Sequence, residues 1–140
     1  AEIIHLRSTT LTVPEAAEVL EVATDQIIKT ILFLADGEPL LAIGCGTARL
    51  GWKALAKYLG ISRRRLKTAS AEVVREVTGY VVGSVPPFGH RTKLRTVVDT
   101  AVYTQPFVYG GGGDIDALMR VDTAVLRRVL GDEVAEISEQ

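Results

Sequence analysis

Residues 26–34, QIIKTILFL, decide the fold of this chain. Side chains alternate between the two faces of a strand. One face of this stretch therefore carries Ile27, Lys29, Ile31 and Phe33, and the other carries Ile28, Thr30, Leu32 and Leu34. Both faces are largely apolar, which is typical of a strand that is buried on two sides. The pattern predicts a central strand with one charge, Lys29, that needs an explanation.

Three explanations of Lys29 are open at this point. An ammonium group buried without a partner costs several kcal/mol. Lys29 can extend its charged end to the rim of the core, or it can pair with an acidic side chain. Alternatively it faces a cavity that receives an anion.

Composition sets broad limits on the chain. With 140 residues, 47% hydrophobic and 24% charged, residues 1–140 are expected to form one globular domain. The net charge of −1 argues against tight nonspecific binding to duplex nucleic acid but allows a local basic patch. The single cysteine, Cys45, excludes an internal disulfide and fits a reducing cytoplasm. We expect no membrane segment, since no apolar run is long enough.

The remaining pattern predicts an α+β fold with a mixed, largely antiparallel sheet and surrounding helices. Asp36-Gly37 is a strong hairpin signal, and Thr12 and Ser70 are helix caps. Strands are expected at 2–6, 26–34, 39–43, 80–82, 95–99, 102–109 and 114–121, and helices at 14–20, 51–59, 71–77 and from Asp122 or Thr123 to Gly131. A continuous βαβαβ series is absent, which disfavours a Rossmann-type fold.

Two glycine-containing segments could carry chemistry. In TGYVVGSVPPFGH, residues 78–90, Gly83 and Pro87 frame a stiff loop whose backbone N–H groups could hold a carbonyl or an oxyanion. A rigid turn between strands is the alternative. The run Gly110–Gly113 could cradle phosphate, but no Gly-Lys-Ser/Thr follows, so it is not a Walker motif. Its alternative is a flexible connection.

Other reactive residues give weaker signals. His5, His90 and Cys45 have no zinc-ligand spacing, so no metal site is expected. Cys45 is interpreted as a small buried thiol. Asp99 is either an ion-pair partner or a strand-end turn residue. The cluster Arg63-Arg64-Arg65 with Lys67 is either a solvated surface or a contact for nucleic-acid phosphates.

Taken in order, these segments resemble the YbaK/ProX family, which also forms the editing insertion domain of bacterial prolyl-tRNA synthetases. The resemblance rests on QIIKTILF, WKALAKYLG, TGYVVGSVPPFG, TVVD and YGGGGDIDALMRV, and it covers nearly the whole chain. It implies the fold of that family, a curved sheet with surrounding helices. It also implies an aminoacyl-tRNA deacylase, an ester hydrolase that edits mischarged tRNA in trans, with alanyl- or cysteinyl-tRNA for proline as typical substrates.

The resemblance assigns roles residue by residue. Lys29 matches the essential lysine, which holds the phosphate of the 3′-terminal nucleotide or orients the ester. Gly83 and Pro87 match the G-x-x-x-P loop that places the scissile carbonyl, with Ser84, Val85 and Pro86 contacting the aminoacyl group. Gly111 and Gly112 match a loop near the site, and Asp99 matches a structural aspartate. A water activated by the tRNA ribose hydroxyl would explain a site without metal, cofactor or triad.

Some features depart from the family pattern. Gly113 and Asp114 stand where basic residues follow the glycine pair in some members, and no aromatic residue lies within His5–Arg7. The implied partners are the 3′ end of aminoacylated tRNA and prolyl-tRNA synthetase, in the cytoplasm. With no synthetase domain in the sequence, a free-standing enzyme is expected. Two alternatives remain: a noncatalytic module that binds tRNA or a synthetase, and a small-molecule binding domain that uses the Gly83–Pro87 pocket.

Overall fold

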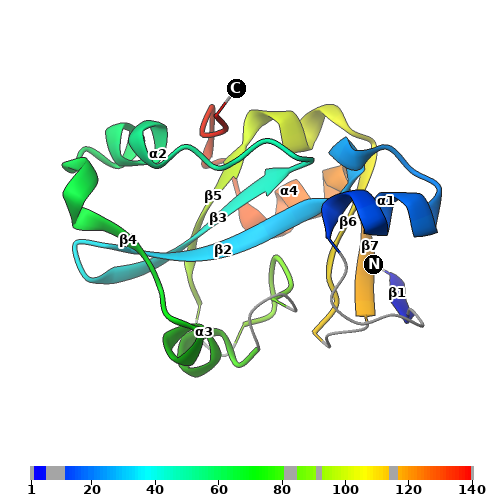
Figure 1. The fold of residues 1–140 in the computed structure, drawn as a ribbon, viewed down its shortest axis with the longest axis horizontal. Coiled ribbons are helices and arrows are strands. Elements are labelled where there is room, and N and C mark those ends of the chain that lie inside the picture. Colours follow the sequence, from blue (N-terminus) through cyan, green and yellow to red (C-terminus); the bar gives the residue numbers. More distant parts are fainter. Residues whose placement is uncertain (1, 6–11, 81–84, 91–92, 114–116, 140) are drawn as a thin grey trace.

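A computed structural model describes residues 2–5, 12–80, 85–90, 93–113 and 117–139. Its strands form two sheets (Figure 1). The five-stranded sheet has the order β4 (Leu66–Thr68), β2 (Ile28–Ala35), β3 (Glu38–Cys45), β5 (Arg95–Asp99) and β8 (Val134–Ala135). The three-stranded sheet has the order β1 (Glu2–His5), β7 (Ala117–Asp122) and β6 (Phe107–Gly111). A single β-bridge between Ile27 and Tyr109 joins the two sheets.

The helices are short and well capped. They are α1 (Val13–Leu20), α2 (Trp52–Leu59), α3 (Ala71–Thr78) and α4 (Thr123–Leu130), with 3-10 turns at Thr24–Gln26, Arg63–Arg65 and Thr100–Thr104. Thr12 caps α1 in a capping box with Glu15, and the Ser70 hydroxyl accepts from the Val73 N–H at the start of α3. Gly60 ends α2 in the left-handed conformation. The caps predicted at Thr12, Ser70 and Gly60 are confirmed, whereas Asp122 stands at the N-cap of α4 without a capping hydrogen bond from its side chain.

The β2–β3 hairpin is the centre of the larger sheet. Asp36 and Gly37 both adopt positive φ, 55° and 84°, as a two-residue type I′ turn requires. This turn sets an antiparallel register in which Ala35 faces Glu38 and Lys29 faces Gly44. The pairs β3–β5 and β5–β8 are parallel, whereas the other strand pairs are antiparallel. The expected mixed, largely antiparallel α+β fold is confirmed.

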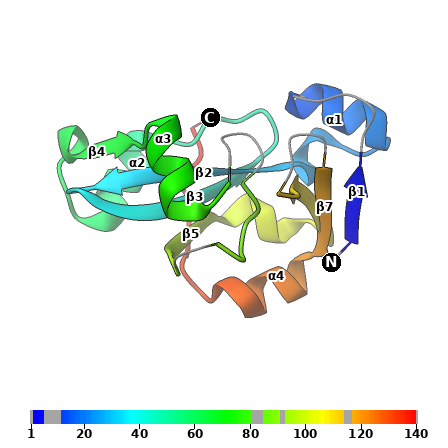
Figure 2. The same ribbon diagram turned by 90° about the horizontal axis from the view of Figure 1, so that it is seen from below.

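Both faces of β2 are covered, as its apolar pattern predicts. On the face of Phe33, Leu55 and Ala56 of α2 and Ile137 near the C-terminus complete a buried cluster. On the other face, Leu32 packs against α3 and against Val85, and Ile28 packs toward α4 (Figure 2). Helix α1 covers the junction with the smaller sheet around Ile27 and Tyr109.

Some element predictions are wrong or fall outside the described residues. Residues 100–104 form a 3-10 turn and not the start of a strand, because the Asp99 carboxylate accepts from the Ala101 N–H and caps the turn. Tyr80 lies outside any strand, and 81–82 lie outside the described residues, as do 114–116 before β7. Strands β4 and β8 are too short, at three and two residues, to give a sequence pattern.

Asp99 ties the C-terminal segment to the sheet. This carboxylate is 2% exposed. Its Oδ1 accepts from the N–H groups of Ile137 and Ser138 at 2.9 and 3.1 Å, and its Oδ2 accepts from Ala101 N–H at 3.2 Å. These bonds agree with the structural role of Asp99 that the resemblance implies. They do not agree with the alternative, in which Asp99 is an ion-pair partner.

We expect Asp99→Ala to lower the free energy of unfolding by about 3 kcal/mol, because three N–H groups lose their acceptor in a buried place. Asp99→Asn should cost less, since the amide oxygen can still accept from Ile137 and Ser138. Urea unfolding measures both values. Asp132→Ala, which removes an exposed carboxylate paired with Arg127, is the matched control, and an equal effect at both positions would contradict this role of Asp99.

Candidate active site

Lys29 lines a pocket on the α2 side of β2. The pocket has a volume of about 320 Å³ and is lined by Lys29, Ile31, Phe33, Arg49, Leu50, Trp52, Thr68 and Glu139. Gly44, opposite Lys29 in the hairpin, leaves the room for it. A Cβ atom at Gly44 would lie 2.8 Å from Leu50 Cδ2 and 3.7 Å from Lys29 Cε. Glycine at this position therefore allows Leu50 and the lysine stem to pack against the strand.

The charge of Lys29 has no carboxylate partner among the described residues. Its Nζ donates to the backbone carbonyl of Ala48, and none of the ion pairs in the described part of the chain includes it. Burial is the main cause that lowers the pKa of Lys29, and the positive charge of Arg49 acts in the same direction. Of the three explanations, the ammonium group that faces a cavity agrees best with this geometry.

The proline loop lies on the opposite side of β2. Val85 is buried in a cluster with Leu32, Leu41 and Val74, and Pro86 and Pro87 are buried as well. Pro87 Cδ lies 3.7 Å from the position that a Cβ atom on Gly110 would occupy, and the side chain of Ile28 borders the same position. Gly83 and Ser84, which were also predicted as site residues, lie outside the described residues. Lys29 and Pro87 therefore flank the same segment of β2 from opposite faces.

The glycine run is a place of close backbone approach. Gly110 lies in β6, where a Cβ would come within 2.8 Å of Ile28 Cγ1. Gly111 pairs with Leu118 across β6 and β7. Gly112 donates its N–H to the carbonyl of Ala117, and a Cβ there would lie 2.9 Å from the backbone carbon of that residue. The first part of the run is thus strand, so the interpretation as a merely flexible connection does not hold for Gly110 and Gly111.

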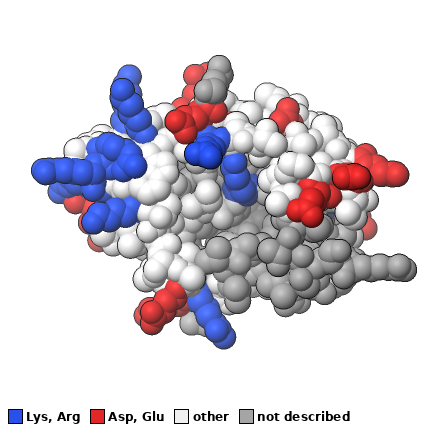
Figure 3. All heavy atoms as spheres, viewed as in Figure 1, with Lys and Arg blue, Asp and Glu red and all other residues white. Residues whose placement is uncertain are grey.

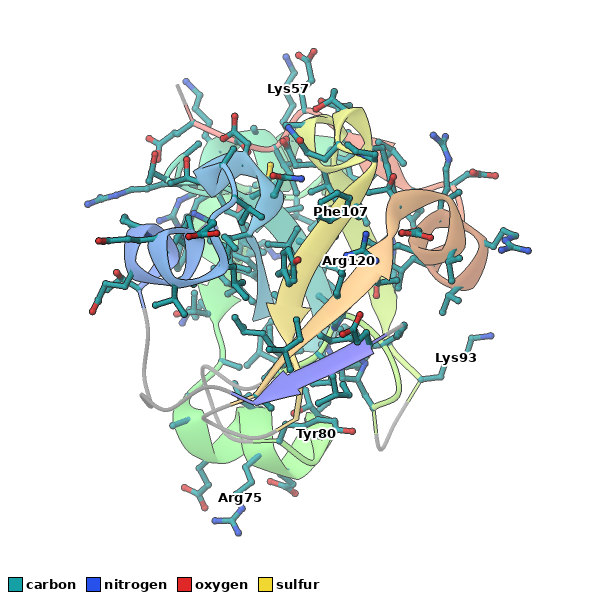
Figure 4. All side chains as sticks on the ribbon, turned by 90° about the vertical axis from the view of Figure 1, so that its right-hand side faces the viewer. Lys57, Arg75, Tyr80, Lys93, Phe107 and Arg120 are labelled. Carbon is teal, nitrogen blue, oxygen red and sulfur yellow. The ribbon has the colours of Figure 1, made fainter. Side chains whose placement is uncertain are left out.

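His90 and Tyr80 hold the proline loop in place. The His90 Nε2 atom lies 2.6 Å from the carbonyl oxygen of Pro86, and the Tyr80 hydroxyl donates to the carbonyl of Gly89 at 3.2 Å. The two rings meet edge to face, with centroids 6.3 Å apart. Figure 4 shows Tyr80 beneath the smaller sheet, beside α3. His90 is thereby bound to a backbone carbonyl, which makes it a positioning residue for the loop.

Nucleophile and metal chemistry find little support in the described residues. Burial, with a smaller effect of nearby Asp25, raises the pKa of the Cys45 thiol to about 11, so it is protonated at neutral pH. The interpretation of Cys45 as a buried thiol is confirmed. No group of three His, Cys, Asp or Glu side chains comes together as metal ligands within the described ranges. None of the described helices is long and apolar enough to cross a membrane.

Sequence reasoning missed two residues of the Lys29 pocket. Arg49 adds a second positive charge, and Trp52, the single tryptophan of the chain, forms a wall. Both follow β3 by several residues: Arg49 lies in the irregular segment before α2, and Trp52 is the first residue of α2. The run of Gly44, Gly46 and Gly51 signals a tight backbone path there, but no periodic pattern shows which side chains return to β2.

Comparison with known proteins agrees with this fold. The family model of the aminoacyl-tRNA editing domain matches residues 8–129. The chain belongs to this family. A crystal structure described as a candidate trans-editing enzyme for prolyl-tRNA synthetase superposes with a TM-score of 0.91 at 32% identity, covering 99% of this chain and 87% of that one. The family resemblance inferred from the sequence is confirmed.

The curated relatives are much longer proteins. A proline–tRNA ligase of Streptococcus equi subsp. equi is 37% identical over 91 residues, which are 65% of this chain and 14% of the ligase. A ligase of Nitratidesulfovibrio vulgaris (strain DP4) is 37% identical over 89 residues, or 64% of this chain and 15% of the ligase. The chain therefore spans about one seventh of the length of these ligases.

We expect His90 to make stability depend on pH. Burial lowers the folded-state pKa of His90 below its ordinary value of 6.5, so the unfolded chain binds the proton more readily. The contribution of neutral His90 to the free energy of unfolding is complete above pH 6.5. It is lost as the pH falls from 6.5 through the lower folded-state pKa. His90→Gln should flatten the decline in the free energy of unfolding as the pH falls below 6.5. Urea unfolding at several pH values tests this, and an unchanged slope in the variant would contradict it.

Proposed function

We propose that this protein is an aminoacyl-tRNA deacylase, which hydrolyses the ester between a wrong amino acid and the 3′ end of tRNA. The observation that carries the proposal is Lys29, a half-buried ammonium group without a carboxylate partner among the described residues, on the wall of a pocket that also contains Arg49. Membership of the editing-domain family supports the reaction.

The geometry favours one of the two roles open for Lys29. Because Lys29 and Pro87 lie on opposite sides of β2, one ester carbonyl in contact with the loop would not also meet the ammonium group. We therefore assign Lys29, together with Arg49, to a phosphate of the 3′-terminal nucleotides, where two cations offset anionic charge. The loop Gly83–Pro87, with Ser84, Val85 and Pro86, is assigned to the aminoacyl group, and Gly111 and Gly112 are assigned to the same substrate site.

The reaction needs few protein groups. A water oxygen attacks the ester carbonyl carbon, the bond to the ribose oxygen breaks, and that oxygen takes up a proton, which yields free amino acid and uncharged tRNA. A ribose hydroxyl of the substrate takes the proton from the attacking water, as the resemblance implies, so no side chain need serve as a base. Backbone N–H groups of the loop hold the developing oxyanion.

The proposed substrates are alanyl- and cysteinyl-tRNA for proline. We propose that the protein receives these mischarged tRNAs after prolyl-tRNA synthetase has made them. A synthetase pocket separates amino acids of similar size by only about 1–3 kcal/mol. A second site must therefore remove the misacylated product. The likeness to a candidate trans-editing enzyme for prolyl-tRNA synthetase supports this setting.

We expect Lys29→Ala to lower kcat/KM for alanyl- or cysteinyl-tRNA by about 100-fold or more, equivalent to about 3 kcal/mol of transition-state stabilisation. The lost ammonium group would otherwise hold the phosphate end of the substrate. Release of the amino acid from radiolabelled mischarged tRNA is the measurement, and thermal unfolding shows that the variant is folded.

Lys93→Ala is the matched control, because Lys93 is exposed, does not line the Lys29 pocket and points away from the fold in Figure 4. It should retain full activity. A fully active Lys29→Ala would reject the assignment of Lys29. Binding of tRNA without hydrolysis of any mischarged species would instead favour a noncatalytic tRNA-binding module.

A further inference from the structure

A strip of exposed basic side chains covers one end of the molecule. We call it the basic ridge; it consists of Lys53, Lys57, Arg63, Arg64, Arg65 and Lys67. Figure 3 shows basic side chains gathered over α2 and the segment that leads into β4, whereas acidic side chains gather over α1. A chain with a net charge of −1 thus carries a local basic surface at one end.

Most charges of the ridge are not neutralised by neighbours. Among the described residues, Arg65 pairs with Asp36 at 2.7 Å. No ion pair within the described ranges includes the other five. Lys53 and Lys57 stand four positions apart, so they lie on one side of α2. Such a surface carries a local positive potential that attracts polyanions.

The ridge continues into the Lys29 pocket. A second pocket of about 550 Å³ is lined by Gly51, Trp52, Lys53, Ala54, Lys57, Arg63, Ser138 and Glu139. Trp52 and Glu139 line both pockets. The Arg63 guanidinium stacks over the Trp52 ring, with Cζ 4.0 Å from the ring centroid. The positive path therefore runs from Lys29 past Arg49 and Trp52 to Arg63 and the outer ridge.

We propose that the basic ridge binds the sugar–phosphate backbone of the RNA arm whose 3′ end enters the Lys29 pocket. The inference rests on the proposed function, since it extends the path of the same substrate. Helix α2, with eight residues, is about 12 Å long, so its two lysines can reach more than one phosphate. The stacked Arg63 presents a flat cation beside the entrance, where an unpaired base can stack.

A protein partner fits this surface less well. The core of a protein interface is depleted of charged residues and enriched in aromatic and apolar ones. In the described part of the chain, Tyr58 is the one exposed large hydrophobic side chain on α2. The others are Ile3, Val19 and Val129. The Tyr58 hydroxyl is already bound to Glu133. Charge complementarity therefore favours RNA.

The test uses two charge-matched double variants. Lys57→Gln/Arg64→Gln removes two charges from the ridge. Arg75→Gln/Arg128→Gln removes two exposed charges elsewhere, on α3 and α4; Lys57 and Arg75 lie at opposite ends of the molecule in Figure 4. Binding of uncharged tRNA is measured by fluorescence anisotropy in a salt series. The ridge variant should bind about tenfold more weakly, and the slope of log K against log salt should shrink by about 1.5, because two phosphate contacts are lost.

Kinetics then separate this inference from the proposed function. For mischarged tRNA, the ridge variant should raise KM and leave kcat unchanged. Its activity on an aminoacylated 3′-terminal oligonucleotide without the acceptor stem should equal that of the unaltered protein. If no ester is hydrolysed but the binding difference persists, the deacylase proposal fails and the ridge remains an RNA surface.

Three results would overturn the ridge proposal. They are equal tRNA binding by the two double variants, an unchanged salt slope, and weakened binding of prolyl-tRNA synthetase with tRNA binding intact, which would make the ridge a protein contact. A second ridge variant, Lys53→Gln/Lys67→Gln, guards against an effect of one altered side chain on folding, and thermal unfolding of all variants shows that each is folded.

Discussion

The burial of β2 on both faces is the constraint on which the rest of the structure depends. A strand with Leu32 on one side and Phe33 on the other has to be covered twice, so helices and loops must return to it from both directions along the chain. The cover on one side includes α2 and residue 137, and the cover on the other includes α3 and the proline loop. Lys29 lies where the cover of this strand is open to a pocket.

The elements that could be predicted from sequence are those with local signals. Asp36-Gly37 specifies its turn by backbone conformation, and Thr12, Ser70 and Gly60 specify helix ends by their own hydrogen bonds or by positive φ. The 3-10 turn after Asp99 was not predictable in this way. Its cap is local, a bond from the Ala101 N–H to Asp99, but the same carboxylate also accepts from residues 137 and 138, and that second contact exists only in the folded chain.

The candidate site also contains residues that the sequence signals locally and residues whose place depends on the folded chain. Lys29 stands out in the sequence because a charge interrupts an apolar strand, and that anomaly survives in three dimensions as a half-buried ammonium group. Arg49 and Trp52 could not be found, because their place beside Lys29 depends on an irregular segment. The resemblance supplied the proline loop and the glycine run. The structure shows a physical reason for glycine at 110 and 112, where neighbouring atoms leave no room for a side chain.

The wall of the Lys29 pocket that contains Glu139 comes from the end of the chain. The Glu139 N–H donates to the carbonyl of Arg49 at 2.7 Å, and Leu50 forms a β-bridge with Ser138. The Asp99 carboxylate accepts from the N–H groups of residues 137 and 138 and so holds this segment in place. During synthesis on the ribosome, the β2–β3 hairpin can pair long before residue 139 has emerged. The pocket is therefore completed after the hairpin, so a partly synthesised chain can have the lysine in place but lack the surface that closes around it.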